Sequence, residues 1–116
     1  MMKPSFRFGR SERLKGRILI KRVFVQGRCI TCSGAKLFIM QNGLSVNRIV
    51  FTFARKYGNA VMRNRSRRLS REAFRLISFR LRPGYDLVLL VYPGRDVFSG
   101  RVQQFHILFS KAGLFT

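Results

Sequence analysis

The sequence predicts an α/β (α+β) protein, a two-layer sandwich in which helices back one mixed four-stranded sheet. The first observation is the spacing of apolar residues, which changes along the chain from a period of about 3.6, typical of helices, to alternation and back. The second is the segment 85–92, which reads Tyr-Asp-Leu-Val-Leu-Leu-Val-Tyr and is nearly continuously apolar. Such a strand is covered on both faces and is often parallel to its neighbour. The expected element order is α-β-β-β-α-β-α.

The N-terminal part predicts an arm followed by a helix. Residues 1–10 are basic and lack apolar periodicity, so we expect a flexible arm, with residues 11–116 forming a single domain. Ser11, followed by an acid, is a typical helix N-terminus. Apolar residues then recur among basic ones through residues 13–25, and Gly27 is suited to end the helix.

Three strands are expected next, at residues 29–32, 36–40 and 47–54, separated by turns that contain glycine. In the second strand Leu37 and Ile39 fall on one face, and the residues between and beside them fall on the other. This alternation predicts that one face of the strand packs against a core.

The C-terminal half predicts a helix, a strand and a second helix. Helical periodicity runs over residues 60–81, the buried strand follows at 85–92, and a last helix runs from Ser99 until Gly113 ends it. In the first of these helices the apolar residues expected to face the core lie in one stripe, which also contains the small residue Ser66. They are Met62, Leu69, Ala73, Leu76 and Ile77.

The charge is far from neutral. The chain has 24 Lys and Arg against 4 Asp and Glu, a formal net charge of +20, yet 47% of its residues are hydrophobic. A folded domain with this charge repels itself, so a polyanion is the expected partner, with nucleic acid first and an anionic membrane surface second. The longest apolar run is too short to span a bilayer. No secretory signal is expected, which favours the cytoplasm.

The residues that could bind a metal or act in catalysis are few. Cys29 and Cys32 form a C-x-x-C, but His106 is the one histidine and there is no second cysteine pair, so two ordinary thiols are expected. The carboxylates are scattered and offer no evident metal cluster. They are Glu12, Glu72, Asp86 and Asp96. We therefore expect neither a catalytic group nor a cofactor in the protein itself.

One segment concentrates the positive charge. Eight basic side chains lie from Arg55 to Arg75, against the single acid Glu72. Arginines recur every fourth residue from Arg63 to Arg75, so each repels the next along one helix face. Phosphates would neutralise that repulsion. A planar guanidinium can also bridge two phosphate oxygens or stack on a base, which lysine cannot do. The segment predicts a nucleic-acid interface.

The same segment carries a family resemblance. It reads Lys56-Tyr57-Gly58-Asn59-Ala60-Val61-Met62-Arg63-Asn64-Arg65, followed by Arg67-Arg68-Leu69 and Arg71-Glu72-Ala73-Phe74. This resembles the protein family of bacterial ribonuclease P, in which a glycine-containing turn leads into an Arg-Asn-Arg helix. Residues 13–15, 23–27 and 83–86 resemble the family as well, and the likeness extends over residues 13–114. It implies a left-handed βαβ crossover through the basic helix, against the usual right-handed rule.

The resemblance implies a function in transfer RNA maturation. In this family the RNA subunit cleaves the 5′ leader from precursor tRNA, with magnesium expected in the RNA-containing holoenzyme, and the protein is a non-catalytic subunit. The implied partners are the ribonuclease P RNA and precursor tRNA, with no DNA or membrane. The residues implied to bind the RNA subunit are Arg55, Lys56, Asn59, Arg63, Asn64, Arg65, Arg67, Arg68 and Arg71.

A cleft between the first helix and the sheet is implied to hold the single-stranded leader. Single strands bind in such clefts by stacking on aromatic rings over a basic floor. The matching positions are Ile20, Phe24, Lys36 and Phe38. Where the family usually has a phenylalanine in the first helix, this chain has Ile20, whose contact with the leader would be apolar and without stacking.

Two other classes remain open on composition alone. The first is a structural RNA-binding protein, for instance a small ribosomal protein, from which the Arg-Asn-Arg helix and its lead-in distinguish this chain. The second is a DNA-compacting or membrane-surface protein, but no dimerisation seam or recognition motif is evident. The charge also predicts that the isolated protein is partly unfolded at low ionic strength and folds when phosphate or RNA binds.

Overall fold

The computed structural model of the protein describes residues 12–116, which form the predicted α-β-β-β-α-β-α order. The predicted arm, residues 1–10, lies outside the described residues. A 3-10 turn at Ser78–Arg80 follows the second helix. The elements are α1 (Arg17–Gln26), β1 (Arg28–Cys32), β2 (Ala35–Gln41), β3 (Arg48–Phe53), α2 (Ala60–Ile77), β4 (Tyr85–Val91) and α3 (Phe98–Ala112).

The four strands form one mixed sheet in the order β1-β2-β4-β3. β2 is antiparallel to β1 and β4, whereas β3 is parallel to β4. The central strand β4 is buried on both faces, and Leu87, Val88 and Leu89 have no exposed surface. The prediction of a doubly covered strand with a parallel neighbour is therefore confirmed.

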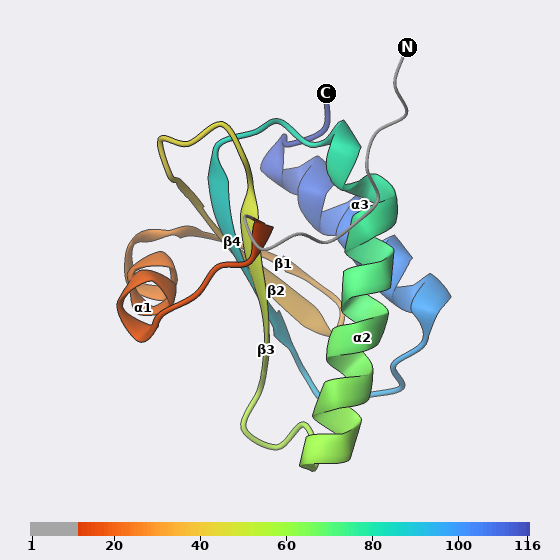
Figure 1. The fold of residues 1–116 in the computed structure, drawn as a ribbon. Coiled ribbons are helices and arrows are strands. Elements are labelled where there is room, and N and C mark those ends of the chain that lie inside the picture. The colour runs from red at the N-terminus through yellow and green to blue at the C-terminus, as the bar shows by residue number, and fades with distance from the viewer. Residues whose placement is uncertain (1–11) are drawn as a thin grey trace.

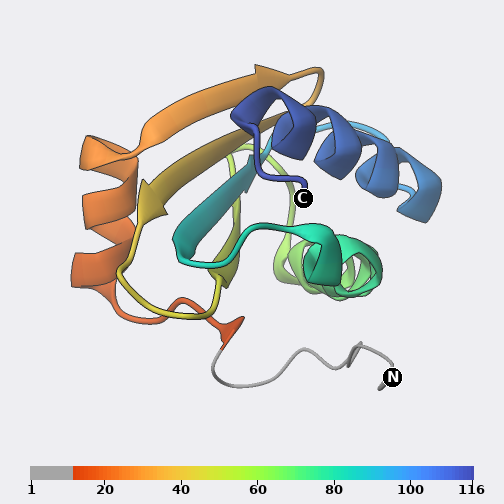
Figure 2. The same cartoon turned by 90° about the horizontal axis from the view of Figure 1, so that it is seen from above.

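Helices lie against both faces of the sheet (Figures 1 and 2). α2 and α3 cover one face, and α1 lies across part of the other. The main core lies between the sheet and the α2–α3 pair, where the rings of Phe105 and Phe109 stack at 5.4 Å and Phe74 packs edge-on against both. A smaller cluster beneath α1 is centred on Leu14, Val23 and Val88. The alternation predicted for β2 is confirmed, with Leu37 and Ile39 buried in the main core.

The connection from β3 through α2 to the parallel strand β4 is left-handed (Figures 1 and 2). This confirms the crossover that the family resemblance implied and departs from the right-handed rule. β3 is an edge strand of the sheet, and α2 runs back alongside it. The crossover therefore places the arginine-rich helix at an open edge of the molecule.

The predicted start of the first helix is wrong. α1 begins at Arg17, because Gly16 before it has φ +95°, a left-handed conformation that cannot continue a helix. The preceding residues extend alongside β3 instead: the Leu14 amide donates to the Ile49 carbonyl oxygen at 3.0 Å, and Arg13 forms a parallel bridge with Ile49. Leu14 is buried there.

The predicted core stripe of α2 is wrong in part. Met62 and Leu76 were expected in the core, but they are 48% and 43% exposed. The buried face consists of Ser66, Ser70, Ala73, Phe74 and Ile77. The small residues let α2 approach its neighbours closely, and the large ring of Phe74 then fills the core. Two apolar side chains, Met62 and Leu69, are consequently left at the side of the basic helix.

Candidate nucleic-acid interface

The lead-in to α2 fixes where the basic helix begins. Asn59 is its N-cap: the backbone is extended there, and the side-chain oxygen accepts a hydrogen bond from the Met62 amide at 3.0 Å. Gly58 before it has φ +152°, a backbone conformation that other residues rarely adopt, and a side chain there would require the Met62 side chain to shift. Asn59, a predicted RNA-binding residue, thus has a structural role in starting the helix.

A polar cluster around Asp96 holds this start against α3. The Tyr57 hydroxyl donates to Asp96 Oδ2 at 2.5 Å, the Ser66 hydroxyl donates to the same oxygen, and Arg101 pairs with Oδ1. Arg101 is only 1% exposed although it lies on an otherwise apolar side of α3. Burial would raise the pKa of Asp96, but the hydrogen bonds from Ser66 and Tyr57 and the charge of Arg101 outweigh it and hold that pKa below its ordinary value.

Sequence reasoning did not find this cluster. Tyr57, Ser66, Asp96 and Arg101 come from the lead-in loop, α2, the loop after β4 and α3. No local pattern links them. The one signal in the sequence is that a chain with so few acids places Asp96 five positions before an arginine at the start of a helix.

One flank of α2 faces β3. The Arg67 guanidinium lies 5.1 Å from the centre of the Phe53 ring, and Arg63 donates to the Arg55 carbonyl oxygen at 3.3 Å. Arg71 lines a small pocket that also includes Arg13, Lys15 and Arg67. Partial burial, and then repulsion from neighbouring arginines, lowers the pKa of Arg71. This flank therefore concentrates positive charge in a hollow between β3 and the helix.

The other flank of α2 faces the start of α3. Arg65 and Arg68 are exposed there and line a groove with Leu69 and Phe98. Within residues 12–116, Arg75 near the end of α2 is paired with Glu72, whereas Arg63, Arg65, Arg67, Arg68 and Arg71 form no ion pair with a carboxylate. All nine residues predicted to bind the RNA subunit lie on the lead-in loop or on the N-terminal two-thirds of α2.

The four residues predicted to bind the leader lie on the opposite face of the sheet. Phe24 of α1 and Phe38 of β2 pack edge to face, with ring centres 4.8 Å apart, and Ile20 packs in the same cluster. Lys36 lies farther along β2, with its ammonium group 5.7 Å from the Tyr92 ring centre. All four are half-buried. The structure thus brings the three apolar residues together and places the cation beside another aromatic ring.

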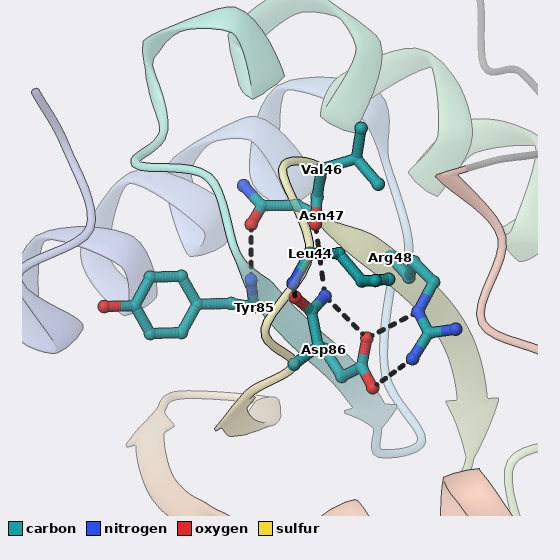
Figure 3. Close-up of polar contacts among 7 residues, drawn as sticks. Leu44, Val46, Asn47, Arg48, Tyr85 and Asp86 are labelled. Carbon is teal, nitrogen blue, oxygen red and sulfur yellow. Dashed lines mark hydrogen bonds and ion pairs between the residues drawn. The ribbon is translucent and has the colours of Figure 1, made fainter.

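Two carboxylates, Asp86 and Asp96, are engaged in structural pairs. Asp86, 6% exposed, accepts two hydrogen bonds of 2.8 Å from the Arg48 guanidinium and one from Asn42 at 3.0 Å (Figure 3). The hydrogen bond to Asp86 raises the pKa of Arg48. Asn47 accepts a hydrogen bond from the Tyr85 amide at 2.8 Å beside them. Together these contacts fasten the β2–β3 loop to β4 and fix the parallel register. The second carboxylate, Asp96, is held in the cluster described above.

The described residues contain no group of three or more His, Cys, Asp or Glu side chains that could hold a metal ion. Cys29 and Cys32 lie in β1, which matches the strand predicted at residues 29–32. Because they are three residues apart, their side chains lie on opposite faces of the sheet. Burial raises the pKa of Cys32. Within residues 12–116, no helix has both the length and the apolar character that crossing a bilayer requires.

Comparison with known proteins shows the family to which the chain belongs. The family model Ribonuclease P matches residues 8–113. The chain is 42% identical to the ribonuclease P protein component of Natranaerobius thermophilus over 66% of this chain and 67% of that protein. It is 36% identical to the one from Symbiobacterium thermophilum over 90% and 94% of the two chains. The solved ribonuclease P protein of Thermotoga maritima superposes with a TM-score of 0.75 at 25% identity, over 86% of this chain and 96% of that one. The chain therefore belongs to the ribonuclease P protein family.

Proposed function

We propose that this chain is the protein subunit of ribonuclease P, which binds the catalytic RNA subunit and assists removal of the 5′ leader from precursor tRNA. The observation that carries the proposal is the row of arginines on the N-terminal two-thirds of α2. Among the described residues no carboxylate pairs with any of them, and the ion pair of this helix, Glu72–Arg75, lies beyond them. Such a surface costs stability in the isolated protein and is relieved by a phosphate backbone. The RNA subunit would contact Arg63, Arg65 and Arg68 from the open edge of the molecule.

The face of the sheet beside α1 would bind the leader. Phe24 and Phe38 offer partly exposed aromatic rings, and Lys36 offers a cation on the same face of the sheet. This combination suits a single strand, whose bases stack on rings while its phosphates meet basic side chains. Arg-lined α2 lies on the other side of the sheet, so the two RNAs would bind different faces of the protein.

The chemistry would belong to the RNA. Asp86 is paired with Arg48, Asp96 with Arg101 and Glu72 with Arg75, which supports a structural role for these carboxylates in this proposal. The protein's contribution to the reaction would be binding and orientation, with the magnesium ions held by the RNA.

The test is cleavage of a precursor tRNA by a bacterial ribonuclease P RNA at low magnesium, with and without this protein. We expect the wild-type protein to restore correct 5′ cleavage, and an Arg65→Ala/Arg68→Ala variant to restore it only at much higher protein concentration. An Arg80→Ala/Arg82→Ala variant is the matched control, because it loses the same charge at exposed positions beyond α2. The control should behave as the wild type does.

Two results would contradict the proposal. A protein that binds RNA but never stimulates cleavage would be a structural RNA-binding protein. Equal losses in the Arg65/Arg68 and Arg80/Arg82 variants would mean that only total charge matters and that α2 has no special role.

A further inference from the structure

A groove between α2 and the start of α3 is lined by both apolar and basic side chains. Its lining includes Leu69 and Phe98 together with Arg65 and Arg68. Phe98 is the first residue of α3 and is 42% exposed. The start of α3 lies beside α2 (Figure 1), and Phe98 lines the groove together with residues of the arginine helix although it is distant from them in sequence.

The apolar surface continues beyond Phe98. Val97 is 39% exposed, and Met62, which helical periodicity assigned to the core, is 48% exposed. Both line the adjoining pocket, which shares Arg65 and Leu69 with the groove. Large apolar side chains that gather at one exposed place mark a binding surface more often than scattered ones do.

The charges around the groove favour a polyanion. Arg65 and Arg68 line it, and Arg95 lines the adjoining pocket. Two carboxylates face these cavities, and each is already engaged. Glu72 accepts a hydrogen bond from Arg75 at 2.5 Å, and both oxygens of Asp96 accept hydrogen bonds from Tyr57, Ser66 and Arg101. The excess of positive charge is therefore available to a ligand.

An aromatic ring flanked by arginines matches the chemistry of an unpaired nucleotide. The base can stack on the ring, because every base has a π-face, while the guanidinium groups pair with its phosphates. A paired base cannot do this, since its faces are covered by its neighbours in the helix. A purely electrostatic contact would leave Phe98, Leu69 and Met62 without a function.

We propose that this groove binds an unpaired nucleotide of the RNA subunit, with its base on Phe98 and Leu69 and its phosphates at Arg65 and Arg68. The proposal rests on the proposed function and adds to it a base-stacking site on the α3 side of the basic helix. Phe98 is then a specificity-determining residue for the RNA partner, at which a bulged or single-stranded position is required.

The experiment measures the affinity of this protein for ribonuclease P RNA without precursor tRNA. Phe98→Ala should weaken binding by roughly 5- to 150-fold, the range that stacking on one base contributes. Phe79→Ala is the matched control, because Phe79 is also an exposed phenylalanine (51%) but lies in the 3-10 turn after α2. The control should bind as the wild type does.

Two further variants separate stacking from simple apolar contact and from charge. Phe98→Tyr should retain binding because its ring can still stack on a base. Phe98→Leu should lose binding because leucine offers apolar contact without an aromatic ring. Phe98→Ala should leave the dependence of log affinity on log salt unchanged, while Arg65→Ala should reduce that slope by about one phosphate contact. Circular dichroism on each variant checks that it is folded.

A photoreactive p-benzoylphenylalanine in place of Phe98 provides a direct readout. A crosslink to an unpaired nucleotide of the RNA supports the proposal. It is overturned if Phe98→Ala binds as tightly as Phe79→Ala, if Phe98→Leu matches the wild type, or if the crosslink forms only to another protein. If the wild type itself fails to bind ribonuclease P RNA, the proposed function fails instead, and the two failures are distinguishable.

Discussion

Asp96 connects more parts of the interface than any other single residue described. Its two oxygens hold the lead-in loop through Tyr57, α2 through Ser66 and α3 through Arg101. Arg101 is fully buried, so its charge depends on this carboxylate for compensation. Asp96 therefore positions the start of α2, the helix that binds RNA in the proposed function, although Asp96 itself binds no RNA there.

Asp96→Asn should lower the free energy of unfolding by about 3 kcal/mol, since it leaves the buried Arg101 charge unpaired. The amide also places a donor where the carboxylate accepted hydrogen bonds. Urea unfolding followed by circular dichroism measures the loss. Glu72→Gln is the control, because it removes one negative charge from the exposed Glu72–Arg75 pair and should change stability little. Similar losses in both variants would show that net charge, and not the buried cluster, determines the effect.

The lowered pKa of Asp96 predicts the direction of a pH effect. A carboxyl group whose pKa is lower in the folded than in the unfolded state stabilises the fold above its unfolded pKa, here near the ordinary value of 3.8. That contribution is lost as the pH falls through the folded pKa. The stability difference between wild type and Asp96→Asn should thus be constant at neutral pH and shrink below about pH 4. A difference that stays constant into strong acid would contradict the ion pair.

At the scale of the elements, α1 and β2 form the site proposed for the leader. Phe24→Ala should weaken binding of precursor tRNA to the holoenzyme, by roughly fivefold or more if one base stacks there, while binding of mature tRNA changes little. Val25→Ala on the same helix is the control, because Val25 is 72% exposed and its loss should not loosen α1. Equal losses for precursor and mature tRNA would place the effect of Phe24 in the fold and not in leader binding.

The order of the elements could be predicted because each element has its own local pattern of apolar and charged residues. Alternation in β2 and the continuous apolar run of β4 decide their strands, and the arginine spacing marks α2. The start of α1 could not be predicted, since it depends on the positive φ of Gly16 and on pairing with β3. The core face of α2 was also missed in part: Ser66, Ala73 and Ile77 are buried as predicted, but Ser70 and Phe74 are buried in place of Met62 and Leu76.

The candidate site divides in the same way. The arginines that face RNA in the proposed function are neighbours in sequence, so their spacing along the chain locates them. The Asp96 cluster and the Phe98 groove depend on α3 returning beside α2, and no sequence pattern contains that contact. A binding surface formed by one helix can therefore be predicted from the sequence, whereas a site formed by residues of several elements can be found only once the fold is known.

At the scale of the whole molecule, the net charge of +20 opposes folding. The fold does not disperse this charge: Arg13, Lys15, Arg67 and Arg71 surround one hollow, and Arg65 and Arg68 border another. Repulsion is thus strongest where the proposed partner binds. Folding and RNA binding should then be coupled, since an anion that neutralises these places favours the native state alone.

We therefore expect inorganic phosphate or sulfate to stabilise the isolated protein by binding, in addition to screening. An anion at a hundredfold excess over its dissociation constant should add about 2.7 kcal/mol to the free energy of unfolding. Thermal unfolding in sulfate and in sodium chloride at equal ionic strength separates the two effects, because screening depends on ionic strength and binding depends on the anion. Arg67→Ala/Arg71→Ala should lose much of the sulfate-specific increase, whereas Arg80→Ala/Arg82→Ala should keep it. Identical curves in the two salts would show that the basic hollows hold no anion and that their repulsion is only screened.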